Sequence, residues 1–126
     1  MTMEWSKTTW DELPAKLVAA NFSAILPIGA TEQHGPHMGC GMDFVLADVL
    51  CKAVAEKTQV PMLPTMPYGC SIGHSQKWPG TIALQPITLI NTIRGAGCRR
   101  CSSTRSGFFP ARAARTSWPA LLSAVN

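Results

Sequence analysis

The chain has 126 residues, of which 46% are hydrophobic, and a formal net charge of +4. This length is enough for one compact domain and too short for two ordinary ones. No run approaches the roughly 18 to 20 apolar residues that span a bilayer, and the N-terminus lacks the basic and then apolar layout of a signal peptide. The sequence therefore predicts a cytoplasmic protein outside the membrane.

The positive charge belongs to the C-terminal tail. Residues 1–94 contain all seven acidic residues, five lysines and Arg94, a net charge of −1, whereas residues 95–126 contain five arginines and no acidic residue. The tail has neither helical nor strand periodicity, and no aromatic pattern in it supports nucleic-acid binding. We expect residues 1–94 to form the folded part and residues 95–126 to be an atypical tail, disordered or read in a shifted frame.

The five cysteines, at positions 40, 51, 70, 98 and 101, form no regular framework. An odd number without a secretion signal favours free thiols in a reducing compartment. Cys98 and Cys101 have the C-x-x-C spacing of a redox or zinc motif. Because one such pair without a partner pair is weak evidence, we interpret it as accidental.

The first predicted elements are a helix over residues 10–20 and a strand over residues 24–28. The prediction of the helix rests on two features. One is a capping-box pair, Thr9 and Glu12, and the other is the apolar stripe formed by Leu13, Leu17 and Val18. The apolar run 24–28 is typical of a strand buried on both faces, as in a parallel sheet. Pro27 within this run favours a strand end or a sheet edge.

The clearest predicted helix begins at Met42. Its apolar residues recur at helical spacing and predict a wide buried face formed by positions 42, 45, 46, 49, 50, 53 and 54. A second strand is predicted over residues 60–66, with its ends made uncertain by three prolines. The order strand, helix, strand implies a parallel βαβ unit.

A glycine-rich loop, a short strand and a helix complete the predicted order. The loop over residues 67–81 has neither period, and its length suggests a functional role or a packing role. Residues 82–84 suit a short strand. Pro86 can occupy the first turn of the last helix, because the first turn needs no backbone donor there.

Three residues after the first strand suggest a metal site. Glu32 and His34 lie two residues apart, so that in extended backbone both side chains point to one side. Asp43 lies at the start of the long helix, where the helix dipole favours a carboxylate. Such a set suits Zn²⁺ or Mn²⁺, which polarise water into a nucleophile. Spacing alone leaves other interpretations open: Asp43 as an N-cap, Glu32 and His34 as a solvated turn, and His37 as a further ligand or a loop residue.

Two longer segments resemble one known family. The run LPIGATEQHGPHMGCGMD is similar to the segment LP-x-G-x-x-EQHG-x-H of the creatininase family, which a similarly spaced aspartate follows. The run MPYGCSIGHSQKWPGTIAL resembles that family's YG-x-S-x-x-H-x-x-[FW]PGT-x-x-L segment. The resemblance covers about residues 5–94. It implies an α/β/α layered fold with a mainly parallel sheet, present here as its N-terminal portion only, and assembly into a homo-oligomer, often a hexamer.

The resemblance also implies an active site with two divalent ions, zinc or manganese. The implied ligands are Glu32, His34 and Asp43, with the aspartate bridging both ions. Next to them the resemblance implies a catalytic His74 and substrate-binding residues Tyr68, Ser71 and Trp78. For His74 a loop-stabilising hydrogen bond is an equal alternative, and Trp78 also suits simple packing.

The implied reaction is hydrolysis of a non-peptide, cyclic amide such as creatinine, a small molecule. Family members that act on a formylamino-pyrimidine nucleotide or on a cofactor-precursor peptide leave the substrate open. The family pattern continues with an Asn-Gly-His motif and later acidic residues, whereas here no histidine follows His74 and no carboxylate side chain follows Glu56. We therefore expect the second metal position to lack ligands and the activity to be impaired. An inactive fragment that binds a partner is the alternative.

Overall fold

The fold is known from a computed structural model, which describes residues 2–96. The element order is η1 (Trp5–Lys7), α1 (Leu13–Ala19), α2 (Met42–Thr58), α3 (Ile72–Ser75) and α4 (Pro86–Gly95). The two predicted long helices are therefore present as α2 and α4, and the loop over residues 67–81 contains the short helix α3. The expectation for the tail lies outside the described residues from position 97 onward.

Extended segments between the helices pair in parallel. Met62 bridges to Glu4 on one side and to Ile25 on the other, and Met66 bridges to Ile28. The backbone hydrogen bonds of the segment 60–66 alternate between its two neighbours. The Met62 N–H donates to the Met3 carbonyl on one side, and the Leu63 N–H donates to the Ile25 carbonyl on the other, each at 2.8 Å. The segment 60–66 thus lies in the centre, and the predicted parallel pairing of residues 24–28 with residues 60–66 is confirmed.

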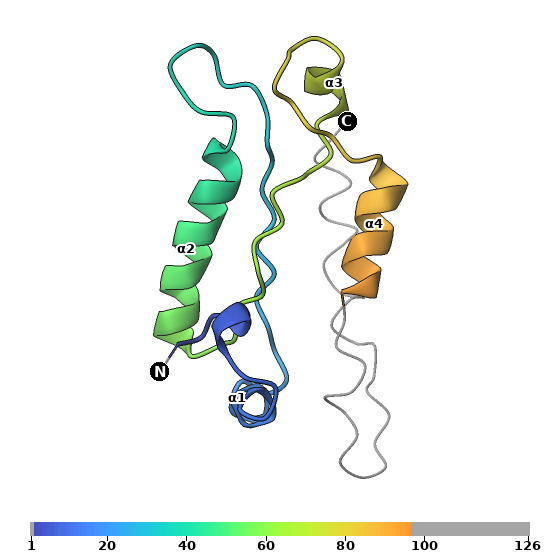
Figure 1. Ribbon diagram of the computed structural model, residues 1–126. Coiled ribbons are helices and arrows are strands. Elements are labelled where there is room, and N and C mark those ends of the chain that lie inside the picture. The colour runs from blue at the N-terminus through green and yellow to red at the C-terminus, as the bar shows by residue number, and fades with distance from the viewer. Residues whose placement is uncertain (1, 97–126) are drawn as a thin grey trace.

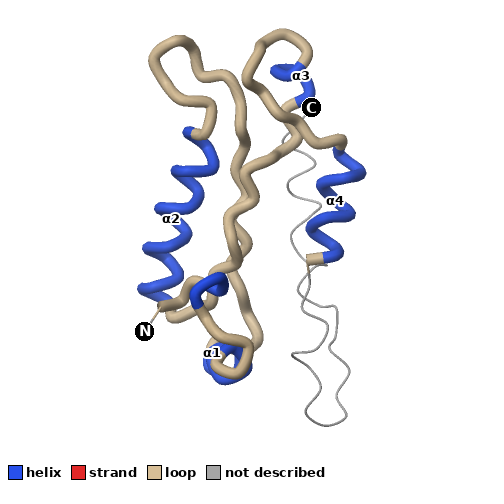
Figure 2. Tube along the Cα trace, viewed as in Figure 1, coloured by secondary structure: helices blue, strands red, loops and turns tan. Residues whose placement is uncertain are grey.

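Prolines interrupt this pairing. The register changes by one residue between the Ile25–Met62 and Ile28–Met66 bridges, and Pro27 and Pro64, which have no backbone N–H, lie inside that interval. Pro27 is fully buried, and its carbonyl accepts a hydrogen bond from the Met66 N–H at 3.0 Å. Within residues 2–96 the segment 24–28 pairs along one side only, with residues 60–66, so Pro27 lies at a sheet edge, as predicted, opposite the bulge that the extra residue between Met62 and Met66 forms. The paired segments are drawn as loops in Figure 2.

The short strand predicted over residues 82–84 bonds to the ends of both parallel segments. The Ile82 N–H donates to the Thr31 carbonyl, in an antiparallel bridge, and the Leu84 N–H donates to the Gly69 carbonyl, each at 2.9 Å. The pairing of the described residues is therefore mainly parallel. Figure 1 shows α2 and α4 on opposite sides of these segments, as the predicted α/β/α layering requires.

The core lies between the C-terminal half of α2 and the central segment. Met3, Ala55 and Met62 are buried there, and Ile25 and Cys51 pack against them. Near α1, Leu13 and Leu17 are buried as predicted, whereas Val18 is 62% exposed. Glu12 and not Thr9 is the N-cap of α1, with no side-chain cap hydrogen bond, so that the predicted capping box does not form.

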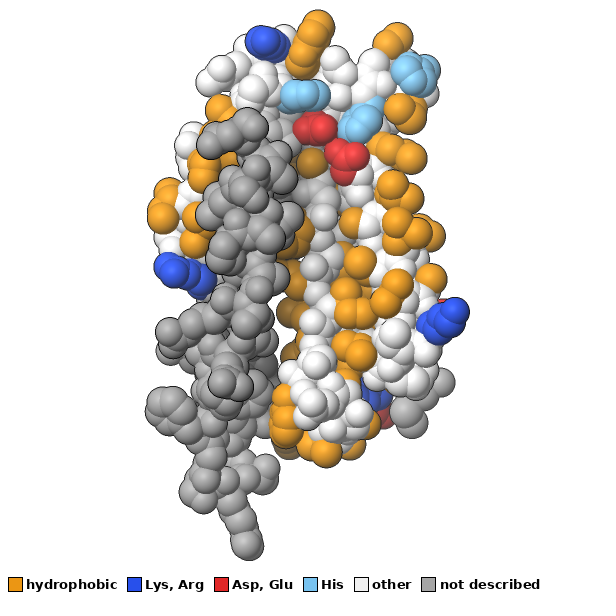
Figure 3. All heavy atoms as spheres, turned by 180° about the vertical axis from the view of Figure 1, so that it is seen from behind, with side chains coloured by type: hydrophobic (Ala, Val, Ile, Leu, Met, Phe, Trp, Pro, Cys, Tyr) orange, Lys and Arg blue, Asp and Glu red, His pale blue; other side chains and the backbone are white. Residues whose placement is uncertain are grey.

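The predicted buried face of α2 is wrong. The apolar side chains on this face are 42–59% exposed, and they are Met42, Val45, Leu46, Val49, Leu50 and Val54. The helix packs on the core through the opposite face, with Cys51 and Ala55. In Figure 3 hydrophobic side chains accordingly cover the outer face of the molecule over α2.

Of the helices within residues 2–96, none combines the length and the apolar character needed to cross a membrane.

Candidate metal centre

The three expected ligands lie where the first extended segment leaves the sheet and returns to a helix. The chain passes from Gly29 through Glu32 and His34, turns back, and enters α2 at Met42. The Glu32 N–H donates to the Cys40 carbonyl at 2.8 Å, which brings the end of the loop to its beginning. Asp43, the second residue of α2, is thereby placed beside Glu32 and His34.

Gly29 allows α2 to approach the extended segment closely. A Cβ atom at position 29 would lie 2.6 Å from the Phe44 backbone nitrogen and still nearer to its Cα. Because these atoms belong to the backbone, a side chain at position 29 would displace the first turn of α2. Asp43 precedes Phe44, so this contact sets the position of the Asp43 carboxylate relative to the loop.

Glu32, His34 and Asp43 offer ligand atoms that converge. One such atom from each residue lies within 4.8 Å of the other two, and no other group of three among residues 2–96 does so. His34 Nε2 lies 3.2 Å from Asp43 Oδ1. Two ligands of a tetrahedral zinc ion lie about 3.4 Å apart, because each lies roughly 2.0–2.2 Å from the metal. The spacing therefore suits one divalent ion.

The protonation of His34 also suits a metal ligand. Its Nδ1 lies 2.9 Å from the Glu32 backbone carbonyl oxygen. Since a carbonyl oxygen only accepts, Nδ1 carries a proton and donates it, which leaves Nε2, beside Asp43, as the nitrogen that an ion can bind in place of a proton. Metal-binding histidines commonly have this arrangement, in which a backbone carbonyl fixes the ring and leaves the other nitrogen for the ion.

The same contacts change the acidity of the ring. The hydrogen bond to the Glu32 carbonyl raises the pKa of His34 above its usual value of 6.5, and the charges of Asp43 and Glu32 add to this effect. A proton on Nε2 links the ring to Asp43, and a divalent ion competes with that proton for the same lone pair. Metal binding at His34 should therefore strengthen as the pH rises through this raised pKa.

The interpretation of Asp43 as an N-cap is wrong. The N-cap of α2 is Gly41, and the helix has no side-chain cap hydrogen bond at this end. The Asp43 carboxylate points to His34 Nε2 instead. Its position in the first turn still places it where the helix dipole favours a negative charge.

His74 reaches the same region from the loop that contains α3. Its Nδ1 lies 4.0 Å from Glu32 Oε2, and its side chain is 51% exposed. The His74 carbonyl accepts hydrogen bonds from the Lys77 and Trp78 N–H groups, which hold the backbone of this turn. Figure 3 shows acidic side chains and histidines gathered at one end of the molecule. The structure thus brings the predicted catalytic histidine to the predicted ligands.

The three predicted substrate-binding residues lie on the loop around α3. Ser71 is the N-cap of α3 and accepts the Ser75 N–H through its carbonyl at 2.9 Å. Tyr68 and Trp78 are 42% and 49% exposed, so that both aromatic rings have surface available for contact with a small molecule. Trp78 is therefore not a core residue within the described part of the chain.

Sequence reasoning missed the residues that hold the loops together. Thr81 accepts the Gln33 N–H through its hydroxyl at 3.1 Å, and the Thr31 hydroxyl donates to the Pro67 carbonyl at 2.8 Å. These bonds join the ligand loop to the loop of α3, and the hydroxyl residues flanking both motifs were the available signal. Gly80, next to Thr81, has φ +85°, a conformation that favours glycine. His37 is exposed and stands outside the ligand group.

The chain is similar to one family of known proteins. Residues 6–103 match the model of the family described as creatinine amidohydrolase. The creatinine amidohydrolase of Pseudomonas putida is 37% identical over 90 residues, which are 68% of this chain and 35% of that protein. A mycofactocin precursor peptide peptidase of Mycobacterium tuberculosis is 30% identical over 98 residues, which are 67% of this chain and 39% of that protein.

Solved structures agree with these relatives. A manganese form of creatininase superimposes with a TM-score of 0.70 and a zinc form with 0.68, each at 33% identity. Both matches cover 75% of this chain and 38% of the solved chain. The matched part of this chain therefore spans between one third and two fifths of the length of these four relatives.

Proposed function

The chain belongs to the creatininase family, and from that membership we propose that it is a metal-dependent amidohydrolase that opens a non-peptide, cyclic amide such as that of creatinine. The observation that carries the proposal is the convergence of Glu32, His34 and Asp43 ligand atoms within 4.8 Å. The manganese and zinc forms among the similar structures support a divalent ion at this position.

Each of the three residues would contribute one ligand atom to the ion. Glu32 and Asp43 contribute carboxylate oxygens, and His34 contributes Nε2, which its Nδ1 hydrogen bond to the Glu32 carbonyl keeps aimed at Asp43. When bound, zinc or manganese supplies Lewis-acid polarisation of the amide carbonyl and lowers the pKa of water. The partly buried setting of all three side chains strengthens their electrostatic interactions.

We assign the remaining predicted residues to the substrate and to the reaction centre. Tyr68 and Trp78 offer exposed aromatic surface to a small planar amide, and Ser71 offers a hydroxyl at the start of α3. His74 is placed in the reaction centre because its Nδ1 faces Glu32 Oε2.

A cofactor-precursor peptide is the second candidate substrate. The support for it is the 30% identity to the mycofactocin precursor peptide peptidase over 67% of this chain. The two candidates differ in size, because creatinine is a small ring whereas a precursor peptide is a longer chain. Parallel assays with creatinine and with a short peptide distinguish them.

The test is metal-dependent turnover by the full chain and two matched variants. The chain is loaded with zinc or manganese, and release of creatine is measured for wild type, Asp43→Asn and Asp48→Asn. Asp48 lies on the same helix, but its carboxylate accepts a hydrogen bond from Thr65, and asparagine preserves that acceptor. We expect Asp43→Asn to lose turnover and Asp48→Asn to keep it.

Two results would count against this function. Turnover that persists in Asp43→Asn or without added metal would show that the predicted ligands are not used. Metal bound at the predicted ligands without hydrolysis of creatinine or peptide would favour the noncatalytic alternative, in which the chain acts only with a partner.

A further inference from the structure

Thr81 is bonded to the peptide group between two of the predicted ligands. Its hydroxyl oxygen accepts the Gln33 N–H at 3.1 Å, and Gln33 lies between Glu32 and His34 in the sequence. The Gln33 N–H and the Glu32 carbonyl belong to one planar peptide unit, so they point in opposite directions and turn together. A bond that holds this N–H therefore also sets the direction of the Glu32 carbonyl.

The Glu32 carbonyl in turn orients the ring of His34. Its oxygen lies 2.9 Å from His34 Nδ1, and the other ring nitrogen, Nε2, lies 3.2 Å from Asp43 Oδ1. A chain of polar contacts thus runs from the Thr81 hydroxyl through the peptide unit and the ring to Asp43. Hydrogen bonds in such a chain polarise one another, so a change at Thr81 reaches the His34 ring.

The Thr81 hydroxyl lies where the backbone pairing supplies no acceptor. Thr31 and Ile82 form an antiparallel bridge, in which the Ile82 N–H donates to the Thr31 carbonyl at 2.9 Å. In a regular antiparallel ladder the next bonded pair lies two residues further along each strand, and it would join the Gln33 N–H to the Gly80 carbonyl. Gly80 has φ +85° and turns the chain away from the ladder, and the Thr81 side chain accepts the bond instead.

The other hydrogen bonds of this stretch are internal to the ligand loop. The Glu32 N–H donates to the Cys40 carbonyl at 2.8 Å, and the Gly35 N–H donates to Gln33 Oε1 at 2.6 Å. These bonds hold residues of the loop to one another. The Thr81 bond comes from a segment 48 residues further along the chain, so it holds the peptide unit from outside the loop.

We infer that Thr81 is a positioning residue of the candidate metal centre. Its hydroxyl fixes the peptide unit whose carbonyl keeps a proton on His34 Nδ1, and Nε2 thereby stays available to the ion. The acceptor that a metal-binding histidine bonds to fixes the tautomer and the ring orientation, and Thr81 acts one bond further out. This role in metal binding rests on the proposed function, whereas the position of the ring proton can be measured without an ion.

The test locates the ring proton of His34 in the full chain, with a chelator present. Nitrogen NMR of the ¹⁵N-histidine protein, at a pH where the ring is neutral, gives the ratio of the Nδ1–H to the Nε2–H tautomer. The His34 signals are those that are missing in His34→Gln. Thr81→Val keeps the shape of the side chain and removes the acceptor, and Thr81→Ser keeps the hydroxyl. Thr92→Val is the matched control, because the Thr92 hydroxyl bonds to the Thr88 carbonyl on the exposed side of α4.

We expect the tautomer ratio to fall by about threefold or more in Thr81→Val, which is the effect of one hydrogen bond on an equilibrium. Thr81→Ser and Thr92→Val should keep the wild-type ratio. Calorimetric titration should show zinc binding to Thr81→Val that is weaker by about the same factor. An unchanged ratio in Thr81→Val, or an equal fall in Thr81→Ser or Thr92→Val, would overturn the inference. A purely structural bond would lower stability and leave the ring proton where it is.

A wild-type measurement covers the case in which Thr81→Val does not fold, which circular dichroism shows. The Gln33 amide should exchange with deuterium about tenfold or more slowly than the Gly39 amide, for which residues 2–96 offer no bonded acceptor. An unprotected Gln33 amide would overturn the role of Thr81. A wild-type protein that binds no zinc contradicts the proposed function instead, and the tautomer ratio still decides the role of Thr81.

Discussion

The two ends of α2 serve different purposes. At its C-terminal half, Ala55 is 1% exposed and packs with Met62 and Met3, so that apolar contacts dominate. At its N-terminus, Asp43 faces His34 across 3.2 Å, so that polar contacts dominate. Stability and metal binding are therefore separated along one helix, and a substitution at one end should leave the property of the other end unchanged.

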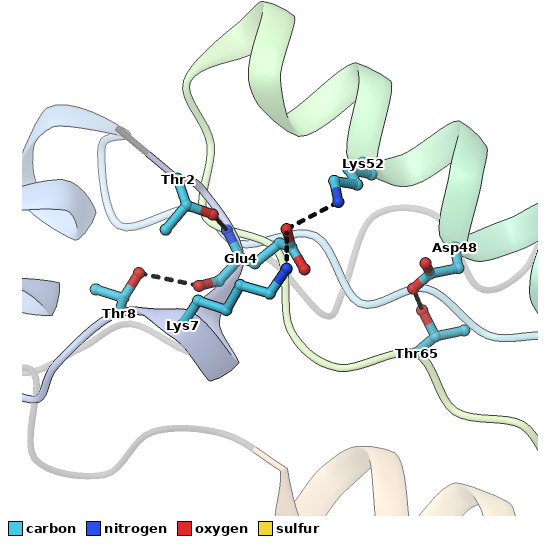
Figure 4. A network of polar contacts seen from close by, with 7 residues as sticks. All are labelled: Thr2, Glu4, Lys7, Thr8, Asp48, Lys52 and Thr65. Carbon is cyan, nitrogen blue, oxygen red and sulfur yellow. Dashed lines mark hydrogen bonds and ion pairs between the residues drawn. The ribbon is translucent and has the colours of Figure 1, made fainter.

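A polar network reinforces the core end. Glu4 forms ion pairs with Lys7 at 3.0 Å and with Lys52 at 2.9 Å, and the Thr65 hydroxyl donates a hydrogen bond to the Asp48 carboxylate. Figure 4 shows these side chains joining the N-terminal segment and the central segment to α2. Here the Glu4 carboxylate lies between two lysines, whereas at the other end two carboxylates and two histidines face one another.

The largest expected effect is at the core end. Met62→Ala should cost about 2–5 kcal/mol of unfolding free energy, because it removes a buried side chain and leaves a cavity. Met38→Ala, at a position that is 41% exposed, is the control and should change stability little. Urea denaturation measures both. If the ends are separate, zinc affinity of the folded Met62→Ala protein equals that of wild type.

The next effect is at the junction between the ends. Gly29→Ala places a Cβ atom 2.6 Å from the Phe44 nitrogen, and relieving this overlap should cost about 1–3 kcal/mol and shift Asp43 away from the loop. Calorimetric zinc titration should show at least tenfold weaker binding. Gly39→Ala has no atom within 4 Å of the new Cβ and should bind zinc normally. Equal affinity in both variants would refute the role of this close approach.

The outer face of α2 should contribute little to stability. Val49 is 59% exposed, so Val49→Lys should change the unfolding free energy by less than about 0.5 kcal/mol. The same substitution at the buried Ala55 should prevent folding. Thermal unfolding at two protein concentrations measures both variants, and a large loss in Val49→Lys would show that this face is covered in solution.

The smallest effect is the pH dependence of the Glu4 network. Hydrogen bonds from Lys52 and then Lys7 lower the pKa of Glu4 below 4.5. Since the folded-state pKa is the lower one, this stabilisation is present above about pH 4.5 and is lost as the pH falls through the lowered pKa. Lys52→Met should therefore be less stable than wild type at pH 6, and the difference should shrink in acid. Lys57→Met, on the exposed side of α2, is the control for loss of charge.

Much of the fold was predictable because apolar runs and helical spacing mark the elements. The parallel pairing followed from the order strand, helix, strand, but the bulge opposite Pro27 did not, since it depends on how two prolines meet across the pair. The buried face of α2 was misassigned because the side that meets the core, with Cys51 and Ala55 beside Asp48 and Lys52, is the less apolar of the two. Periodicity shows that a helix has an apolar face, and it does not show which face meets the core.

The candidate site was predictable in part. Glu32 and His34 followed from alternation in extended backbone, and Asp43 from the family motif. Two features of the site depend on the paths of two loops, which residue spacing in the sequence does not determine. They are the close approach of α2 to Gly29 and the position of His74 opposite Glu32. The cytoplasmic location, the homo-oligomer and the boundary at residue 94 stay predictions.

Nitrogen NMR of the His34 ring shows directly whether His34 Nε2 and Asp43 bind one divalent ion together. The full chain with Cys98→Ser and Cys101→Ser is labelled with ¹⁵N-histidine and titrated with zinc, with Asp43→Asn in parallel. We expect the His34 Nε2 resonance to move at the first equivalent of zinc, while Nδ1 keeps the proton that it donates to the Glu32 carbonyl. Asp43→Asn should need at least tenfold more zinc for the same change. A response confined to His37, or an unchanged titration in Asp43→Asn, would contradict this expectation.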